Sequence, residues 1–261
     1  MSLWLRFEHA GKQGFGTLNG DTIQVHAGGL FDAPAATGEN LPLAAVTLLT
    51  PTTPSKFIGL WNNYHAAAEK QGNAIPAEPL YFLKGANSLL AHGQAIRAPA
   101  LYDGRVVYEG ELGIVIGQQA SNVSEADAGN YIFGYTCVND VTALDLIQHD
   151  PAFAQWTRAK SFDTFGVVGP CIATGLDPAV LTVRTLVNGR ERQNYPCSDM
   201  IFPPRRLVSL ISKELTLMPG DVIACGTSLG VTTLKPGATV EVVIDGIGVL
   251  SNLFQSSQTS S

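Results

Sequence analysis

Residues 106–117, with the sequence VVYEGELGIVIG, are the stretch that decides the fold. Branched, large and aromatic side chains predominate in this stretch, which predicts a buried β-strand. Two carboxylates, Glu109 and Glu111, interrupt the apolar run with only Gly110 between them. Because side chains alternate across a strand, residues two positions apart share a face. The two acids are therefore expected to stand side by side.

Two adjacent ionised carboxylates are costly in an apolar sheet unless a positively charged group lies beside them. A divalent cation that prefers oxygen ligands would fill that role, and Mg²⁺ or Mn²⁺ is the expected ion, with Ca²⁺ as a substitute. The alternative is that this face of the strand is wet and that the two acids are merely solvated. The residues alone leave both interpretations open.

A second apolar run covers residues 131–146, YIFGYTCVNDVTALDL, and contains another acid of interest. Its first part has strand-forming character and ends at Asn139 and Asp140, and residues 141–148 are expected to be helical. Asp140 is then either the N-cap of that helix or the third carboxylate of an all-oxygen site. In the second case, water and a chelating substrate would complete the octahedron that Mg²⁺ requires.

Together these two stretches resemble the fumarylacetoacetate hydrolase family. Its pattern is a strand carrying Glu-x-Glu, followed by a G-[YF]-T-x-x-N-D-[VL]-[TS] run. The matching residues here are YEGEL at 108–112 and GYTCVNDVT at 134–142. Further blocks recur in order between about residue 56 and residue 254, among them AKSFDTF at 159–165 and PGDVI at 219–223.

The resemblance implies an α+β fold that is predominantly β, a mixed β-sandwich roll preceded by a small N-terminal β domain. The expected divisions are residues 1–54 for the N-terminal domain and linker, 55–254 for the catalytic domain and 255–261 for a flexible tail. Residues 4–25 are expected to form two or three short strands with turns between them. Residues 33–54, rich in Ala, Pro and Thr, are expected to be a linker with one short helix.

The resemblance also implies a metal site and a catalytic lysine. Glu109, Glu111 and Asp140 would bind one divalent ion. Lys160, in the family's A-K-x-F-D motif, would lie over that ion, where its compact charge can pair with a developing oxyanion.

Three further residues are expected to bind substrate or to support the site. Lys84 matches a family F-x-K position with a structural or substrate-facing role. Thr227 would offer its hydroxyl and backbone N–H to the substrate, although a plain turn residue beside a glycine is the alternative. Gln148 lies one position beyond the glutamine of the family pattern, so substrate recognition there is expected to differ from that of acylpyruvate-cleaving members.

A general base is expected on the segment GLWNNYHAAAE, residues 59–69. Hydrolytic members carry G-x-N-Y-x-x-H-x-x-E, in which the His and Glu activate water. Here His65 directly follows Tyr64, and Glu69 is four residues on, a spacing that still shares a helical face. Either His65 and Glu69 form the dyad, or the dyad is absent and another group delivers the proton. Residues 61–79 are expected to form a lid that brings His65 to the metal only when substrate is bound.

These features predict a metal-dependent hydrolase that cleaves a C–C bond of an acylpyruvate-like 2,4-diketo acid through a metal-stabilised pyruvate enolate. Two alternatives use the same electron sink: decarboxylation of a 2-oxo diacid and isomerisation of a 2-hydroxydienoate. Neither needs a base that activates water. A non-catalytic module that binds a 2-oxo acid is a third interpretation.

Composition narrows the setting in which this chemistry is expected. The chain of 261 residues has a formal net charge of -6 and no basic stripe, which argues against a nucleic-acid partner. It has no apolar run long enough for a bilayer and no signal-peptide pattern at its start, so a cytoplasmic enzyme without a membrane partner is expected. The four cysteines are expected to be buried free thiols. The resemblance implies a homodimer, with the apolar residues 200–204 (MIFPP) near the shared surface.

Overall fold

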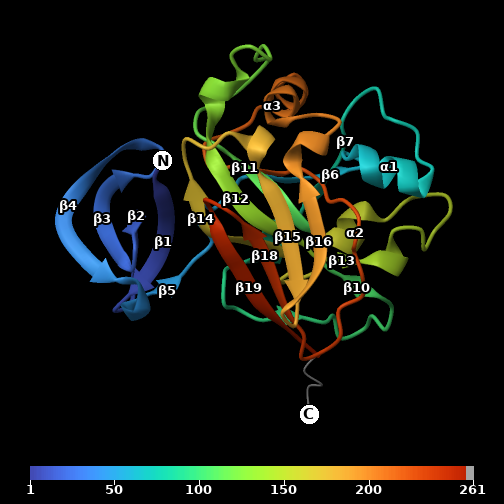
Figure 1. Cartoon of the computed structure of the whole chain (residues 1–261), viewed down its shortest axis with the longest axis horizontal. Coiled ribbons are helices and arrows are strands. Elements are labelled where there is room, and N and C mark those ends of the chain that lie inside the picture. The colour runs from blue at the N-terminus through green and yellow to red at the C-terminus, as the bar shows by residue number, and fades with distance from the viewer. Residues whose placement is uncertain (257–261) are drawn as a thin grey trace.

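The computed structural model describes residues 1–256, which are built mainly from β-strands (Figure 1). At the centre of the main sheet lies β11 (Gly110–Ile116), whose seven residues are all buried. It pairs antiparallel with β12 (Ile132–Asp140) on one side and with β17 (Val222–Ala224) on the other. The expected buried strand is confirmed from Gly110 onward, whereas Val106–Val107 form a separate short strand, β10.

The main sheet continues outward from β11 in both directions. β12 pairs with β14 (Gly166–Ala173), to which the short β8 (Leu89–Leu90) adds in parallel. On the other side, β17 runs parallel to β6 (Phe57–Trp61), and β6 pairs with the edge strand β7 (Leu80–Lys84). All of β17 and the first four residues of β6 are buried, as expected for strands that are covered on both faces.

A second sheet lies against the main one and is drawn in front of β11 and β12 in Figure 1. Its strands follow the order β16 (Arg190–Pro196), β15 (Thr182–Val187), β18 (Thr239–Ile244), β19 (Gly248–Gln255) and β9 (Ile96–Arg97). Side chains from both sheets, such as Leu112 and Val242, are fully buried in one hydrophobic cluster. The predicted sandwich, predominantly β, is therefore confirmed.

The N-terminal strands form a separate lobe on one side of Figure 1. They are β1 (Leu3–His9), β2 (Lys12–Asn19), β3 (Thr22–Gly29), β4 (Asp32–Pro42) and β5 (Thr47–Leu48). The strands expected between residues 4 and 25 are thus present, and β1 joins the main sheet because Leu3 and Trp4 pair with the end of β14.

The expectation of a linker over residues 33–54 was wrong in its first part, because residues 32–42 form β4. β4 is the outer strand of the lobe and pairs with β3 alone. An edge strand needs only one row of backbone hydrogen bonds and little side-chain burial, so Ala, Gly and Pro are tolerated there. The short helix expected in this segment is a 3₁₀ turn at Leu43–Ala45.

The α-helices are short and peripheral: α1 (His65–Gln71), α2 (Trp156–Lys160) and α3 (Pro204–Ser212). The helix expected at residues 141–148 was wrong. Thr142–Ala143 form the strand β13, which pairs with β10, and Leu144–Leu146 form a 3₁₀ turn. The β-branched Val141 and Thr142 favour extended backbone, and the pairing with β10 decides between the two structures. Other 3₁₀ turns lie at Ala86–Ser88, Ala128–Tyr131, Pro178–Val180 and Cys197–Asp199.

Three smaller expectations can also be compared with the structure. All four cysteines are buried free thiols, as predicted. In the part of the chain that is described, no helix is both long and apolar enough to cross a membrane. The tail predicted from residue 255 was wrong at its first residue, because Gln255 pairs with Arg97 at the end of β19, and residues 257–261 lie outside the described residues.

Candidate active site

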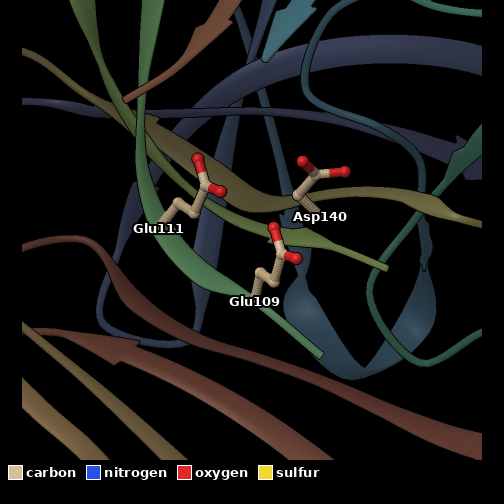
Figure 2. A group of neighbouring side chains, drawn as sticks. All are labelled: Glu109, Glu111 and Asp140. Carbon is tan, nitrogen blue, oxygen red and sulfur yellow. The ribbon is translucent and has the colours of Figure 1, made fainter. Parts of the chain in front are cut away.

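Three carboxylates converge where β11 begins and β12 ends. Glu109 immediately precedes β11, Glu111 is its second residue, and Asp140 is the last residue of β12. One carboxylate oxygen from each lies within 4.8 Å of the others, and Figure 2 shows the three groups turned toward one another. Glu111 and Asp140 are fully buried, so the solvated-face interpretation of the Glu-x-Glu pair is wrong.

The backbone holds the two ligand-bearing segments in register. The Asn139 side chain accepts a hydrogen bond from the Glu109 N–H at 3.1 Å, and the Asp140 N–H donates to the Glu109 carbonyl at 2.9 Å. The residues directly after Asp140 lead into the strand β13 instead of an α-helix, and the Asp140 carboxylate binds two lysines. The alternative that Asp140 is a helix N-cap was therefore wrong.

Gly110 is fixed between the two glutamates by side chains from the second sheet and a nearby loop. Its N–H donates to Gln193 Oε1 at 3.0 Å, and its carbonyl accepts from Thr227 Oγ1 at 3.0 Å and from the Tyr195 hydroxyl. A Cβ at this position would lie 2.0 Å from Thr185 Oγ1, so only glycine fits without displacing a neighbour. Gln193 and Tyr195 were not assigned from the sequence, because their role depends on which sheet faces Gly110.

Two buried lysines balance most of the negative charge. Lys160, at the end of α2, lies 2.6 Å from both Glu109 Oε2 and Asp140 Oδ2. Lys84, at the end of β7, lies 2.5 Å from Asp140 Oδ1. Lys84 is buried and is not among the residues that line the cleft beside the carboxylates. The structure thus brings both lysines to the carboxylates.

Burial and charge shift the pKa values of this cluster in opposite directions. Burial, reinforced by Asp140 and Glu109, raises the pKa of Glu111 well above its ordinary value. Burial acts against Asp140 as well, but Lys160 and Lys84 outweigh it and lower its pKa. Burial likewise opposes the charge of Lys160, yet the surrounding carboxylates raise its pKa, so its ammonium stays protonated.

The donor set fits a divalent cation. Glu111 Oε2 accepts a hydrogen bond from the Gly226 N–H at 2.7 Å, whereas Glu111 Oε1 is buried without a hydrogen-bond partner among residues 1–256. A buried carboxylate oxygen left without a donor is costly. When all five groups are ionised, the three carboxylates exceed the two ammonium groups in charge. An all-oxygen site with this excess suits Mg²⁺ or Mn²⁺.

A cleft of about 410 Å³ leads to this cluster. Glu109 and Lys160 line its floor, and Thr227 begins the loop on one side. Another part of the lining is aromatic: Phe82 stacks on Trp156 with ring centroids 5.4 Å apart, and the Trp61 ring lies 5.9 Å from that of Trp156. Its volume suits a small organic substrate.

Helix α1 borders the cleft with a face that the sequence did not single out. Lys70 and Gln71 line the cleft, whereas His65 and Glu69 are exposed and are not among its lining residues. Successive helical residues turn by about 100°. The face that carries Lys70 and Gln71 is therefore about half a turn away from the face that carries His65 and Glu69.

Counting along the family pattern does not identify this face. Counted from Asn63 and Tyr64, the His and Glu positions fall on Ala67 and Lys70, whereas counted from Gly59, which begins the pattern, they fall on His65 and Ala68. Gln148, the third expected substrate contact, is exposed and lines a neighbouring apolar pocket with Leu80 and Trp156 instead of the cleft.

Comparisons with known proteins agree with this fold. The profile described as Fumarylacetoacetate (FAA) hydrolase C-terminal matches residues 56–255, and one described as Rv2993c-like, N-terminal matches residues 3–51. Oxaloacetate tautomerase YisK of Bacillus subtilis (strain 168) is 36% identical over 89% of this chain and 83% of its own.

Two solved structures resemble the whole chain. The 2-hydroxyhepta-2,4-diene-1,7-dioate isomerase from Mycobacterium marinum has a TM-score of 0.91 and 38% identity, covering 99% of this chain and 100% of that one. Maleylpyruvate hydrolase from Sphingobium sp. SYK-6, solved with manganese(II) and pyruvate, has a TM-score of 0.80 and 28% identity, covering 99% and 100%. With its Glu-x-Glu strand, its Asp on the neighbouring strand and its sandwich fold, this chain belongs to the fumarylacetoacetate hydrolase family.

Proposed function

We propose that this protein is a divalent-metal-dependent enzyme that shifts a proton within a small 2-oxo acid, as a keto–enol tautomerase or double-bond isomerase. The observation that carries the proposal is the orientation of α1, which presents Lys70 and Gln71 to the cleft and His65 and Glu69 to solvent. Proton shifts need an enolate sink, whereas hydrolysis also needs a base that activates water. The tautomerase and isomerase among the similar proteins support the same choice.

Glu109, Glu111 and Asp140 would hold Mg²⁺ or Mn²⁺, which supplies Lewis-acid polarisation of the 2-oxo group when it is bound. Lys160 keeps its proton and borders the cleft, so its ammonium can donate a charged hydrogen bond to the enolate oxygen. Thr227 Oγ1 donates to the Gly110 carbonyl and accepts from Gln193 Nε2 at 2.8 Å. Its remaining lone pair suits it to accept a hydrogen bond from an enol hydroxyl.

The test uses purified protein loaded with Mg²⁺ or Mn²⁺ and a panel of oxaloacetate, hydroxydienoates and acylpyruvates. We expect rapid metal-dependent loss of the oxaloacetate enol absorbance, and deuterium exchange at the carbon next to the 2-oxo group in D₂O. The variant Lys160→Met, with an intact fold by circular dichroism, should lose at least about a hundredfold of that rate. Absence of exchange with every 2-oxo acid in the panel would sink the proposal.

C–C hydrolysis, the function predicted from the sequence, is the second candidate. It is supported by the shared helical face of His65 and Glu69 and by the hydrolase among the similar structures. Acylpyruvate cleavage that outpaces enol loss would move this candidate ahead. Release of CO₂ from oxaloacetate at a rate above that of enol loss would instead identify a decarboxylase.

A further inference from the structure

Lys70 is a cation for which residues 1–256 provide no ion-pair partner. Its side chain is exposed, lines the cleft, and makes no ion pair or hydrogen bond within residues 1–256. The other ammonium of the cleft, Lys160, is buried and is already paired with Glu109 and Asp140. The cleft therefore offers an anionic ligand one positive charge that is not already in an ion pair. This charge is the ammonium group of Lys70 on α1, which is exposed, whereas Lys160 is buried.

The part of the cleft lining beside Lys160 is aromatic. Lys160 Nζ lies 4.8 Å from the centre of the Phe82 ring, and Phe82 and Trp156 are nearly parallel, at 13°. Trp61 continues this aromatic lining. A carbon chain can bury its surface here, and Lys160 and Lys70 are the two cations among the residues that line the cleft.

We infer that Lys70 determines specificity by binding a second carboxylate at the distal end of the substrate, so that the enzyme prefers 2-oxo dicarboxylic acids. The first carboxylate and the 2-oxo group lie at the floor beside Lys160, and the chain between the carboxylates lies on the aromatic lining. This inference rests on the proposed function for the identity of the reacting end. It assigns Lys70 no part in the proton shift.

The test compares 2-oxoadipate with 2-oxohexanoate, which share a carbon chain and differ in the terminal carboxylate. Binding is measured by calorimetry with the Mg²⁺-loaded protein, and deuterium exchange by NMR. Lys70→Gln should weaken binding of 2-oxoadipate and raise its KM about tenfold, the effect of losing one partly exposed charged hydrogen bond. The affinity for 2-oxohexanoate should not change, and Lys70→Arg should keep the preference for 2-oxoadipate.

Lys213→Gln serves as the matched control, because Lys213 is exposed, lies at the end of α3 and does not line the cleft. It should leave both affinities unchanged. Equal losses for the two acids in Lys70→Gln, or a lower melting temperature with the preference intact, would overturn the inference and leave Lys70 as a charge that favours the C-terminus of α1. If the wild type exchanges neither acid but still binds 2-oxoadipate through Lys70, the proposed function fails and the assignment of Lys70 stands.

Discussion

At the scale of single residues, Glu111 differs from the other two carboxylates. One of its oxygens is held by the Gly226 N–H, and no lysine contacts either oxygen. Glu111→Gln keeps the shape and the hydrogen bond from Gly226 but removes the charge that a cation requires. We expect the variant to fold and to lose Mn²⁺ binding and activity, measured by calorimetry and circular dichroism. Tight stoichiometric Mn²⁺ binding by this variant would contradict the site.

A second prediction concerns Gly110, where a substitution should be harmful and a second substitution, at Thr185, should reverse part of the harm. Gly110→Ala should destabilise the protein by about 1–3 kcal/mol through overpacking and weaken Mn²⁺ binding, because the new Cβ would lie 2.0 Å from Thr185 Oγ1. Thr185 Oγ1 has no hydrogen-bond partner, so Thr185→Ala removes the obstacle without breaking a bond. The double variant should regain Mn²⁺ affinity. A loss in the double variant equal to that in Gly110→Ala would show that the clash with Thr185 is not the cause.

At the scale of elements, strand alternation predicted which side chains of one strand share a face. The structure of residues 141–148 and the orientation of α1 depend on tertiary contacts. The alternation of Glu109 and Glu111, with Asp140 from the family pattern, gave the carboxylate cluster. The pairing of β13 with β10 overrode the helical preference of residues 141–148, and this choice depends on a partner distant in sequence. The orientation of α1 was equally inaccessible, because its spacing shows which residues share a face but not which face meets the cleft.

The orientation of α1 also gives a test of the lid expected at residues 61–79. A hinge motion would move α1 closer to the carboxylates but would keep Lys70 on the facing side, so His65 reaches the substrate only if the helix also turns about its axis. We therefore expect His65→Ala to leave enol loss and metal affinity unchanged. A drop of about a hundredfold in acylpyruvate cleavage, the scale of acid–base catalysis, would show that the helix does turn and would favour the hydrolase.

At the scale of the whole molecule, the four buried thiols report on the packing of the main sheet, which holds or adjoins three of them, and of the 3₁₀ turn at Cys197–Asp199. Burial raises the pKa of Cys171 and of Cys197 to about 12, and raises those of Cys137 and Cys225 as well. The thiolate is the reactive form, so a disulfide reagent at pH 8 should modify none of the four until denaturant is added. Rapid labelling of one thiol in the native protein would reveal local opening of the structure around it.

The same shifts predict a loss of stability in alkali. Folding raises the pKa of these thiols above the ordinary 9.0, so their contribution is complete below that pH and is lost as pH rises toward 12. At pH 10 the loss should be on the order of 1 kcal/mol for each of Cys171 and Cys197. Urea unfolding at pH 8 and pH 10 measures it. The variant Cys171→Ala with Cys197→Ala should show a smaller decrease, and an unchanged decrease would assign the effect to other groups.

The oligomeric state is also a property of the whole molecule. The segment at residues 200–204, expected near a shared surface, buries Met200 and Phe202 within its own chain and is therefore poorly placed to form one. Apolar side chains are exposed on both faces of the edge strand β7, where Leu80 and Leu83 are 41% and 43% accessible, and Trp61, which pairs with Leu80 from β6, is 40% accessible. Unpaired sheet edges with large apolar side chains favour association, so we expect a second copy of the chain to pack against β7.

Light scattering at micromolar concentrations should therefore give twice the monomer mass of 27.6 kDa. Leu83→Glu should shift the mass toward the monomer, because the charge would be buried at the edge of β7 when two copies associate. Val180→Glu is the matched control: Val180 is 77% accessible and lies in the 3₁₀ turn at Pro178–Val180, which leads into β15 of the second sheet, whereas β7 belongs to the main sheet. A wild-type mass near 27.6 kDa throughout would refute the dimer, whereas a dimer unaffected by Leu83→Glu would place the shared surface elsewhere. Since Trp61 belongs both to this apolar edge and to the cleft wall, dissociation by Leu83→Glu should also weaken substrate binding.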